Sequence, residues 1–137
     1  MSARTKKNQG MNWLTPKKRL AIYLRDGLAC AYCGRSIEDE ARLTLDHLTP
    51  HSLGGSNAAG NLVTACLICN SSRGARSWTQ FARSVANYLD HDVTPQAIRQ
   101  HILRCIARDL RPYLAQAQDL LTLRGGFTAA LHATHNL

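Results

Sequence analysis

Residues 30–33 read Cys-Ala-Tyr-Cys, residues 45–50 read Leu-Asp-His-Leu-Thr-Pro, and residues 66–70 read Cys-Leu-Ile-Cys-Asn. A two-residue spacer lets one tight turn aim both sulfurs of a Cys-x-x-Cys pair at the same point, and two such pairs suit tetrahedral Zn²⁺. We therefore predict a structural zinc site that pins the segment between the pairs. Its ligands are Cys30, Cys33, Cys66 and Cys69. Two disulfides, or buried apolar thiols, are the alternative interpretation.

The start of the chain and the cysteine usage bear on the cellular compartment. Residues 1–13 are polar and basic, with no apolar stretch of signal-peptide length, and no later stretch is long and apolar enough to cross a bilayer. Thiols that bind zinc are typical of a reducing compartment. We expect a cytoplasmic protein that has no membrane partner.

The charge balance favours an anionic partner. The chain carries 17 Lys and Arg against 9 Asp and Glu, for a formal net charge of +8. Nucleic acid or an acidic surface would suit this excess, although a basic protein without such a partner has the same composition. The cations gather at the start of the chain and after the second cysteine pair, where a solvated arm and a solvated helix end are the alternatives. The candidate nucleic-acid contacts are Lys17, Lys18, Arg19, Arg73 and Arg76.

Capping and turn signals divide the rest of the chain. Thr15-Pro16 opens a helix, with Thr as the cap and Pro at the first helical position. Residues 43–47 alternate apolar and polar types as a short strand does, and residues 61–65 indicate the return strand, before a helix that carries Asn70. After Ser77, apolar residues recur at three- and four-residue steps, which predicts packed helices. The predicted parts are a flexible basic arm (1–12), a zinc-stapled module (13–77), a helical extension (78–126) and a mobile tail (127–137).

Within the zinc-stapled segment, Asp46-His47, Asn61 and Asn70 follow one another in a specific order, with Gly54-Gly55 between them. This arrangement resembles the HNH endonuclease family, whose pattern is an Asp-His pair at the end of a strand, an Asn before the return strand, and an Asn or His beside the second metal turn. The resemblance implies an α+β fold. That fold is a small ββα-metal module stapled by a four-cysteine zinc site, with an N-terminal helix and a helical C-terminal extension.

The resemblance, which covers residues 28–77, also implies a reaction. It is the metal-dependent hydrolysis of DNA phosphodiester bonds, leaving 5′-phosphate and 3′-hydroxyl ends. By analogy His47 is the general base, Asp46 and Asn70 hold one divalent cation, and Asn61 braces the loop that presents His47. Carboxylate and amide oxygens suit Mg²⁺ or Mn²⁺, and a neutral imidazole can accept a proton near pH 7. The expected partner is double-stranded DNA, and a phage-packaging or restriction assembly is a compatible setting.

Two questions stay open at this point. Neighbours on a regular strand point to opposite faces, so Asp46 and His47 can serve one phosphate only if the backbone bends beside them. The alternative function is a non-catalytic zinc module that binds nucleic acid or a partner protein. Such a module has no need for Asp46, His47 and Asn70 together.

Overall fold

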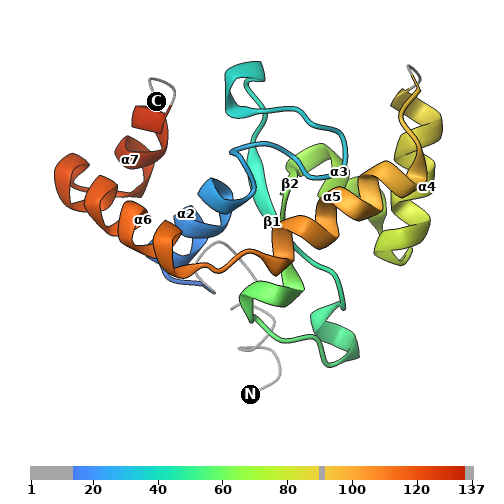
Figure 1. Cartoon of the computed structure of the whole chain (residues 1–137), viewed down its shortest axis with the longest axis horizontal. Coiled ribbons are helices and arrows are strands. Elements are labelled where there is room, and N and C mark those ends of the chain that lie inside the picture. The colour runs from blue at the N-terminus through green and yellow to red at the C-terminus, as the bar shows by residue number, and fades with distance from the viewer. Residues whose placement is uncertain (1–13, 90–91, 135–137) are drawn as a thin grey trace.

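The computed structural model describes residues 14–89 and 92–134, and the predicted basic arm lies outside this part of the chain. In the described residues, six α-helices and a two-stranded sheet form the α+β fold that the sequence predicts. Figure 1 shows the sheet near the centre of the molecule, with helices on both sides of it. No helix within residues 14–89 and 92–134 combines the length and the hydrophobicity that a bilayer crossing requires.

The centre of the fold is an antiparallel hairpin of β1 (Leu43–His47) and β2 (Leu62–Cys66). His47 lies opposite Leu62, so the end of β1 lies beside the start of β2. Helix α3 (Leu67–Arg73) follows β2 without a linker, because the Cys66 side chain accepts a hydrogen bond from the Cys69 N–H and so caps the helix. This order of strand, strand and helix is the predicted ββα module. Three short 3₁₀ turns complete it, η1 (Ile37–Asp39), η2 (His51–Leu53) and η3 (Ala59–Asn61).

Helix α2 (Pro16–Arg25) precedes the module and begins where the capping signals predict. The Thr15 hydroxyl oxygen accepts a hydrogen bond from the Lys18 N–H at 3.2 Å. The helix ends in an ion pair between Arg25 and Asp26 at 2.7 Å, and both side chains are 0% exposed. A buried charge is tolerated only when it is paired and hydrogen-bonded, so the rest of this network matters for the fold.

The Arg25–Asp26 pair is bonded on its other sides to the hairpin. Arg25 donates to the carbonyl oxygens of Ala59 and Leu62, and Asp26 accepts from the Thr64 N–H at 2.8 Å. These bonds tie the end of α2 to η3 and to β2. The scaffold of the module therefore includes the N-terminal helix.

The helices that follow the module pack on both sides of it. Helices α4 (Trp78–Leu89) and α5 (Pro95–Ala107) contribute to a core that also holds the cysteine turns and β2. Helix α6 (Arg111–Arg124) crosses to the other side, where it packs against α2. Figure 1 shows α4 and α5 on one side of the hairpin and α6 beside α2 on the other. The helical extension therefore continues the core of the module.

The end of the chain differs from the prediction of a mobile tail over residues 127–137. Phe127–Ala133 form helix α7, whose Phe127 ring meets the Tyr23 ring edge-on with centroids 6.2 Å apart. Ala130 is completely buried against α2 and α6. Seven residues are too few to reveal a helical period in the sequence, and tertiary packing stabilises so short a helix. Residues 135–137 lie outside the described part of the chain.

The Arg25–Asp26 network predicts a large stability effect from residues that do not line the candidate catalytic cavity. Asp26→Ala leaves the Arg25 charge buried without its partner, so we expect the free energy of unfolding to fall by about 3–5 kcal/mol. Urea titration followed by circular dichroism measures this loss. The matched control is Asp109→Ala, because the Asp109–Arg111 pair is solvent-exposed and its removal should leave the unfolding midpoint nearly unchanged. Equal effects of the two substitutions would contradict the structural role of the buried pair.

Candidate active site and metal centre

Four of the five cysteines form a compact cluster. The sulfurs of Cys30, Cys33, Cys66 and Cys69 all lie within 4.8 Å of one another, and the Cys33 and Cys66 sulfurs are 3.8 Å apart. Tetrahedral zinc with Zn–S bonds near 2.3 Å separates its sulfurs by about 3.8 Å, whereas a disulfide needs about 2.05 Å. All five cysteines are free thiols, so the disulfide interpretation is wrong. The donor set and its spacing fit a structural zinc ion.

The two cysteine turns have the same local geometry. The Cys33 N–H points to the Cys30 sulfur at 3.5 Å, and the Cys69 N–H points to the Cys66 sulfur at 3.4 Å. Such N–H donors stabilise thiolates. Hydrogen bonding to Cys30 lowers the pKa of the Cys33 thiol, and hydrogen bonding to Cys30 and Cys33 raises the pKa of Cys69. The four sulfurs therefore carry less negative charge than four thiolates would. A divalent cation bound among them would neutralise this charge.

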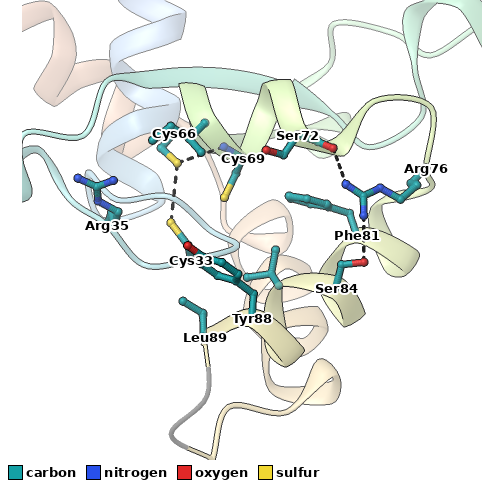
Figure 2. Close-up of a pocket in the computed structure, with 12 residues that line it drawn as sticks. Cys33, Arg35, Cys66, Cys69, Ser72, Arg76, Phe81, Ser84, Tyr88 and Leu89 are labelled. Atoms are coloured by element: carbon teal, nitrogen blue, oxygen red, sulfur yellow. Dashed lines mark hydrogen bonds between the residues drawn. The ribbon is translucent and has the colours of Figure 1, made fainter.

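The cysteine cluster faces a hollow between α3 and α4. Figure 2 shows Cys33 and Cys69 together with Phe81 and Tyr88 of α4 among the residues that line this hollow. Its volume is about 450 Å³. None of Asp46, His47 and Asn70 lines it, so the hollow lies apart from the predicted catalytic residues.

A second cavity, of about 180 Å³, brings together three of the four predicted catalytic residues, whereas Asn61 does not line it. Asp46 and His47 reach it from the end of β1, and Asn70 reaches it from α3. Its remaining lining residues are Leu45, Pro50, His51, Arg73 and Gly74. Three side chains that the sequence separates by up to 24 positions thus share one small, polar hollow.

Asp46 points into the protein at the inner edge of this cavity. The residue is 5% exposed, and its carboxylate accepts hydrogen bonds from the Tyr32 hydroxyl at 2.7 Å and from Arg73 at 2.9 and 3.0 Å. Burial raises the pKa of the Asp46 carboxyl, although the bonds from Tyr32 and Arg73 act in the opposite direction. Tyr32 lies inside the first cysteine turn, so this turn both presents sulfurs and holds the candidate metal-binding carboxylate.

Arg73 holds the end of β1 in place. Its side chain is 5% exposed, and besides Asp46 it donates to the carbonyl oxygens of His47 at 2.6 Å and Leu48 at 3.0 Å. These carbonyls belong to the residues at which the strand ends and the backbone turns. The guanidinium is fully engaged inside the protein, which corrects the expectation that Arg73 clamps phosphates on the surface.

The other predicted nucleic-acid contacts differ in exposure. Arg19 is 3% exposed and bonds to the Tyr23 hydroxyl at 3.4 Å, so its prediction as a surface contact is wrong. Lys18 is half-buried, and its ammonium donates to the Asn57 carbonyl oxygen at 2.9 Å. Lys17 and Arg76 are exposed, although Arg76 also donates to Ser84 at 3.0 Å. Lys17 and Arg76 thus stay candidates for a phosphate contact.

His47 points away from Asp46, toward the loop between the strands. Its side chain is half-buried, and its Nε2 lies 2.8 Å from Oδ1 of Asn57. Asp46 and His47 point in opposite directions because successive side chains on a β-strand face opposite sides of the sheet. Both still line the same cavity, because the strand ends at His47 and the chain turns there over α3.

The two asparagines are held by different bonds. Asn70 uses both amide hydrogens on β1, donating to the Thr44 hydroxyl at 2.9 Å and to the Leu45 carbonyl at 3.1 Å. Both bonds to β1 use the amide nitrogen of Asn70, so they leave its side-chain oxygen unused. Asn61 instead braces the loop, since its amide accepts from the Thr49 N–H and donates to the carbonyls of Thr49 and Ser56.

Comparison with known proteins gives this segment a family. Residues 30–86 match the family model described as HNH endonuclease. Over these residues the chain is similar to the HNH endonuclease family. The chain also matches the crystal structure of the Type II-C Cas9 enzyme from Actinomyces naeslundii, with 23% identity and a TM-score of 0.41, over 77% of this chain and 13% of that one. No protein of curated function matches the chain.

Sequence reasoning missed two residues of the candidate site. Tyr32 reads as a turn residue between two cysteines, although a buried tyrosine hydroxyl usually needs a partner. Asn57 reads as a loop residue, because asparagine is common in turns. Only the fold brings Tyr32 to Asp46 and Asn57 to His47, over sequence distances of 14 and 10 positions.

Metal analysis tests the cysteine cluster of the HNH module. We expect one zinc per chain, and Cys66→Ser should lose the metal and unfold much of the module, since zinc binding contributes to folding. Inductively coupled plasma spectrometry and circular dichroism give the two readouts. The matched control is Cys105→Ala, a buried thiol of α5 outside the cluster, which should retain its zinc. A wild-type protein that purifies folded without zinc would contradict the assignment.

The buried Asp46–Arg73 pair predicts a stability effect that depends on pH. Arg73→Ala leaves the buried Asp46 carboxylate without its cationic partner. We therefore expect the free energy of unfolding, measured by urea titration near pH 7, to fall by about 3–5 kcal/mol. Removing the cation raises the pKa of Asp46 further, and protonation then relieves the unpaired charge. The loss should therefore be smaller near about pH 5 than near pH 7. Arg83→Ala, on the exposed face of α4, serves as the control and should have little effect at either pH.

Proposed function

We propose that this protein is a metal-dependent endonuclease that hydrolyses phosphodiester bonds of double-stranded DNA and leaves 5′-phosphate and 3′-hydroxyl ends. The observation that carries the proposal is the single cavity lined by Asp46, His47 and Asn70, inside the segment that matches the HNH endonuclease family. A carboxylate, an amide oxygen and an imidazole at one hollow supply two hard metal ligands and one base.

Asp46 and Asn70 are the residues that would hold the catalytic cation. Oxygen donors of this kind suit Mg²⁺ or Mn²⁺ better than a soft metal. Both side chains are held in place by hydrogen bonds, Asp46 by Tyr32 and Arg73 and Asn70 by β1. A divalent ion bound there would neutralise charge on the phosphate and on the departing 3′ oxygen.

His47 would act on the attacking water. Its imidazole accepts a proton from the water while the water oxygen bonds to phosphorus, and the bond from phosphorus to the 3′ oxygen breaks. The departing oxygen takes its proton from solvent, which yields the 3′-hydroxyl. His47 then returns its proton to solvent. The backbone of His47 is anchored by Arg73, so the base and the carboxylate keep a constant separation.

The charge of the protein supports an interaction with DNA. The formal net charge is +8, and Lys17 and Arg76 are exposed around the module. Such cations contact phosphates without reading the base sequence, and they make binding depend on salt concentration. Four thiols placed around one point suit the reducing, cytoplasmic setting that we propose.

One observation favours a second function, that of a non-catalytic zinc module which binds nucleic acid or a protein. The Asp46 carboxylate is already paired with Arg73 and bonded to Tyr32, as a purely structural carboxylate would be. A nuclease needs this carboxylate to contribute an oxygen to a metal as well. The two functions therefore differ in whether the cavity supports cleavage.

Plasmid cleavage distinguishes these functions. We expect wild-type protein to nick supercoiled plasmid when Mg²⁺ or Mn²⁺ is present and not when both are omitted. His47→Ala should lower the rate at least about 100-fold, because a positioned base contributes that much. The nicks should be sealed by DNA ligase, which requires 5′-phosphate and 3′-hydroxyl ends.

The control for this experiment is His132→Ala, a histidine of α7 far along the chain from the HNH segment, which should cut like wild type. Zinc content and thermal unfolding verify that both variants are folded. A wild-type protein that binds DNA and never cuts it would favour the non-catalytic module. Equal cleavage by His47→Ala and wild type would refute the role of His47.

A further inference from the structure

We propose that Asn57 is a positioning residue for the reaction: its side-chain oxygen fixes the ring of His47 so that the proton sits on Nε2 and Nδ1 is the atom that accepts a proton from water. This inference rests on the proposed role of His47 as the base. It adds a residue that neither the sequence pattern nor the family match assigns.

The contact itself sets the chemistry of the ring. Oδ1 of Asn57 lies 2.8 Å from Nε2 of His47. An amide oxygen can only accept a hydrogen bond, so a neutral His47 must carry its hydrogen on Nε2. The ring lone pair is then on Nδ1. The bond at one ring nitrogen thus determines which nitrogen acts as the base.

Asn57 is itself held from outside the loop. The Lys18 ammonium of α2 donates to the Asn57 carbonyl oxygen at 2.9 Å. This contact joins two residues 39 positions apart, and it leaves the Asn57 side chain available to His47. Lys18, which the sequence suggests as a DNA contact, therefore acts on the loop in this structure.

The residues just before Asn57 are also fixed. The Asn61 amide donates to the Ser56 carbonyl at 2.8 Å and to the Thr49 carbonyl at 3.1 Å. Gly55 packs so closely that a Cβ there would lie 1.8 Å from the Thr49 oxygen. A loop braced on both sides of Asn57 can hold a ring at one angle, whereas a loose loop could not.

This arrangement divides two tasks between two asparagines. Asn61 bonds only to backbone atoms and determines the path of the loop. Asn57 bonds to the reacting side chain and determines the direction of its lone pair. Loss of Asn57 should therefore affect the chemical step more than folding or DNA binding.

The experiment compares wild type with Asn57→Ala, Asn57→Asp and the control Ser52→Ala, an exposed residue of η2 in the same loop. Asn57→Ala keeps the backbone carbonyl that Lys18 binds but removes the acceptor for Nε2. Asn57→Asp keeps an acceptor oxygen. Zinc content and thermal unfolding should match wild type in all three variants.

The first readout is ¹⁵N NMR of the His47 ring above neutral pH, with the signals assigned from a His47→Gln spectrum. We expect wild type and Asn57→Asp to show a protected N–H at Nε2, and Asn57→Ala to lose this protection because the hydrogen exchanges with water. The second readout is plasmid nicking, in which Asn57→Ala should lower kcat roughly 10–100-fold with little change in KM. Ser52→Ala should resemble wild type in both.

The outcomes separate this inference from the proposed function. A wild-type ring protonated at Nδ1, or an Asn57→Ala variant that keeps both the protected N–H and the wild-type kcat, would overturn the role of Asn57. A protein that never nicks DNA, yet loses the protected N–H in Asn57→Ala, would overturn the nuclease function while leaving the positioning contact intact. Recovery of kcat by Asn57→Asp would support the inference, since a merely structural loop residue gains nothing from an acceptor oxygen.

Discussion

Adjacent side chains on a strand face opposite ways, and the candidate site depends on how the end of β1 accommodates this constraint. Asp46 faces inward to Tyr32 and Arg73, and His47 faces outward to Asn57. Arg73 binds the carboxylate and also the carbonyls of His47 and Leu48, just where the strand ends. One guanidinium thus neutralises the buried charge and shapes the backbone, so that both side chains reach the same cavity.

The scaffold around this strand end is stabilised at two distant points. The cysteine cluster joins the first turn to the start of α3, and its geometry fits zinc. The buried Arg25–Asp26 pair joins the end of α2 to η3 and β2. Both connections are made by polar or thiol side chains, and both join residues that are far apart in the sequence. A small module buries little apolar surface, so it needs such connections for stability. The helical extension adds packing on the two sides.

Several cations of this protein have a structural role. Arg19, Arg25 and Arg73 are each at most 4% exposed, although net charge alone would place them among potential DNA contacts. Arginine is suited to this because its planar fork can satisfy several carbonyl and carboxylate oxygens at once. Arg25 and Arg73 are paired with the buried carboxylates of Asp26 and Asp46, so their burial hardly changes the net charge at the surface and instead reduces the number of cations that can reach a partner. Any DNA interface depends on the exposed cations, Lys17 and Arg76 among them.

The sequence alone determined the metal-binding thiols, the hairpin and helix order, and the HNH pattern of Asp46, His47 and Asn70. These features are local, since they depend on two-residue spacers, strand alternation and capping residues. Only the tertiary structure showed that Arg73 is buried, that α7 is a helix, and that Tyr32 and Asn57 bond to Asp46 and His47. Those contacts join residues 10 to 27 positions apart, or depend on packing between helices. No periodicity or spacing rule records which distant side chains will meet, because that is decided by how the whole chain packs.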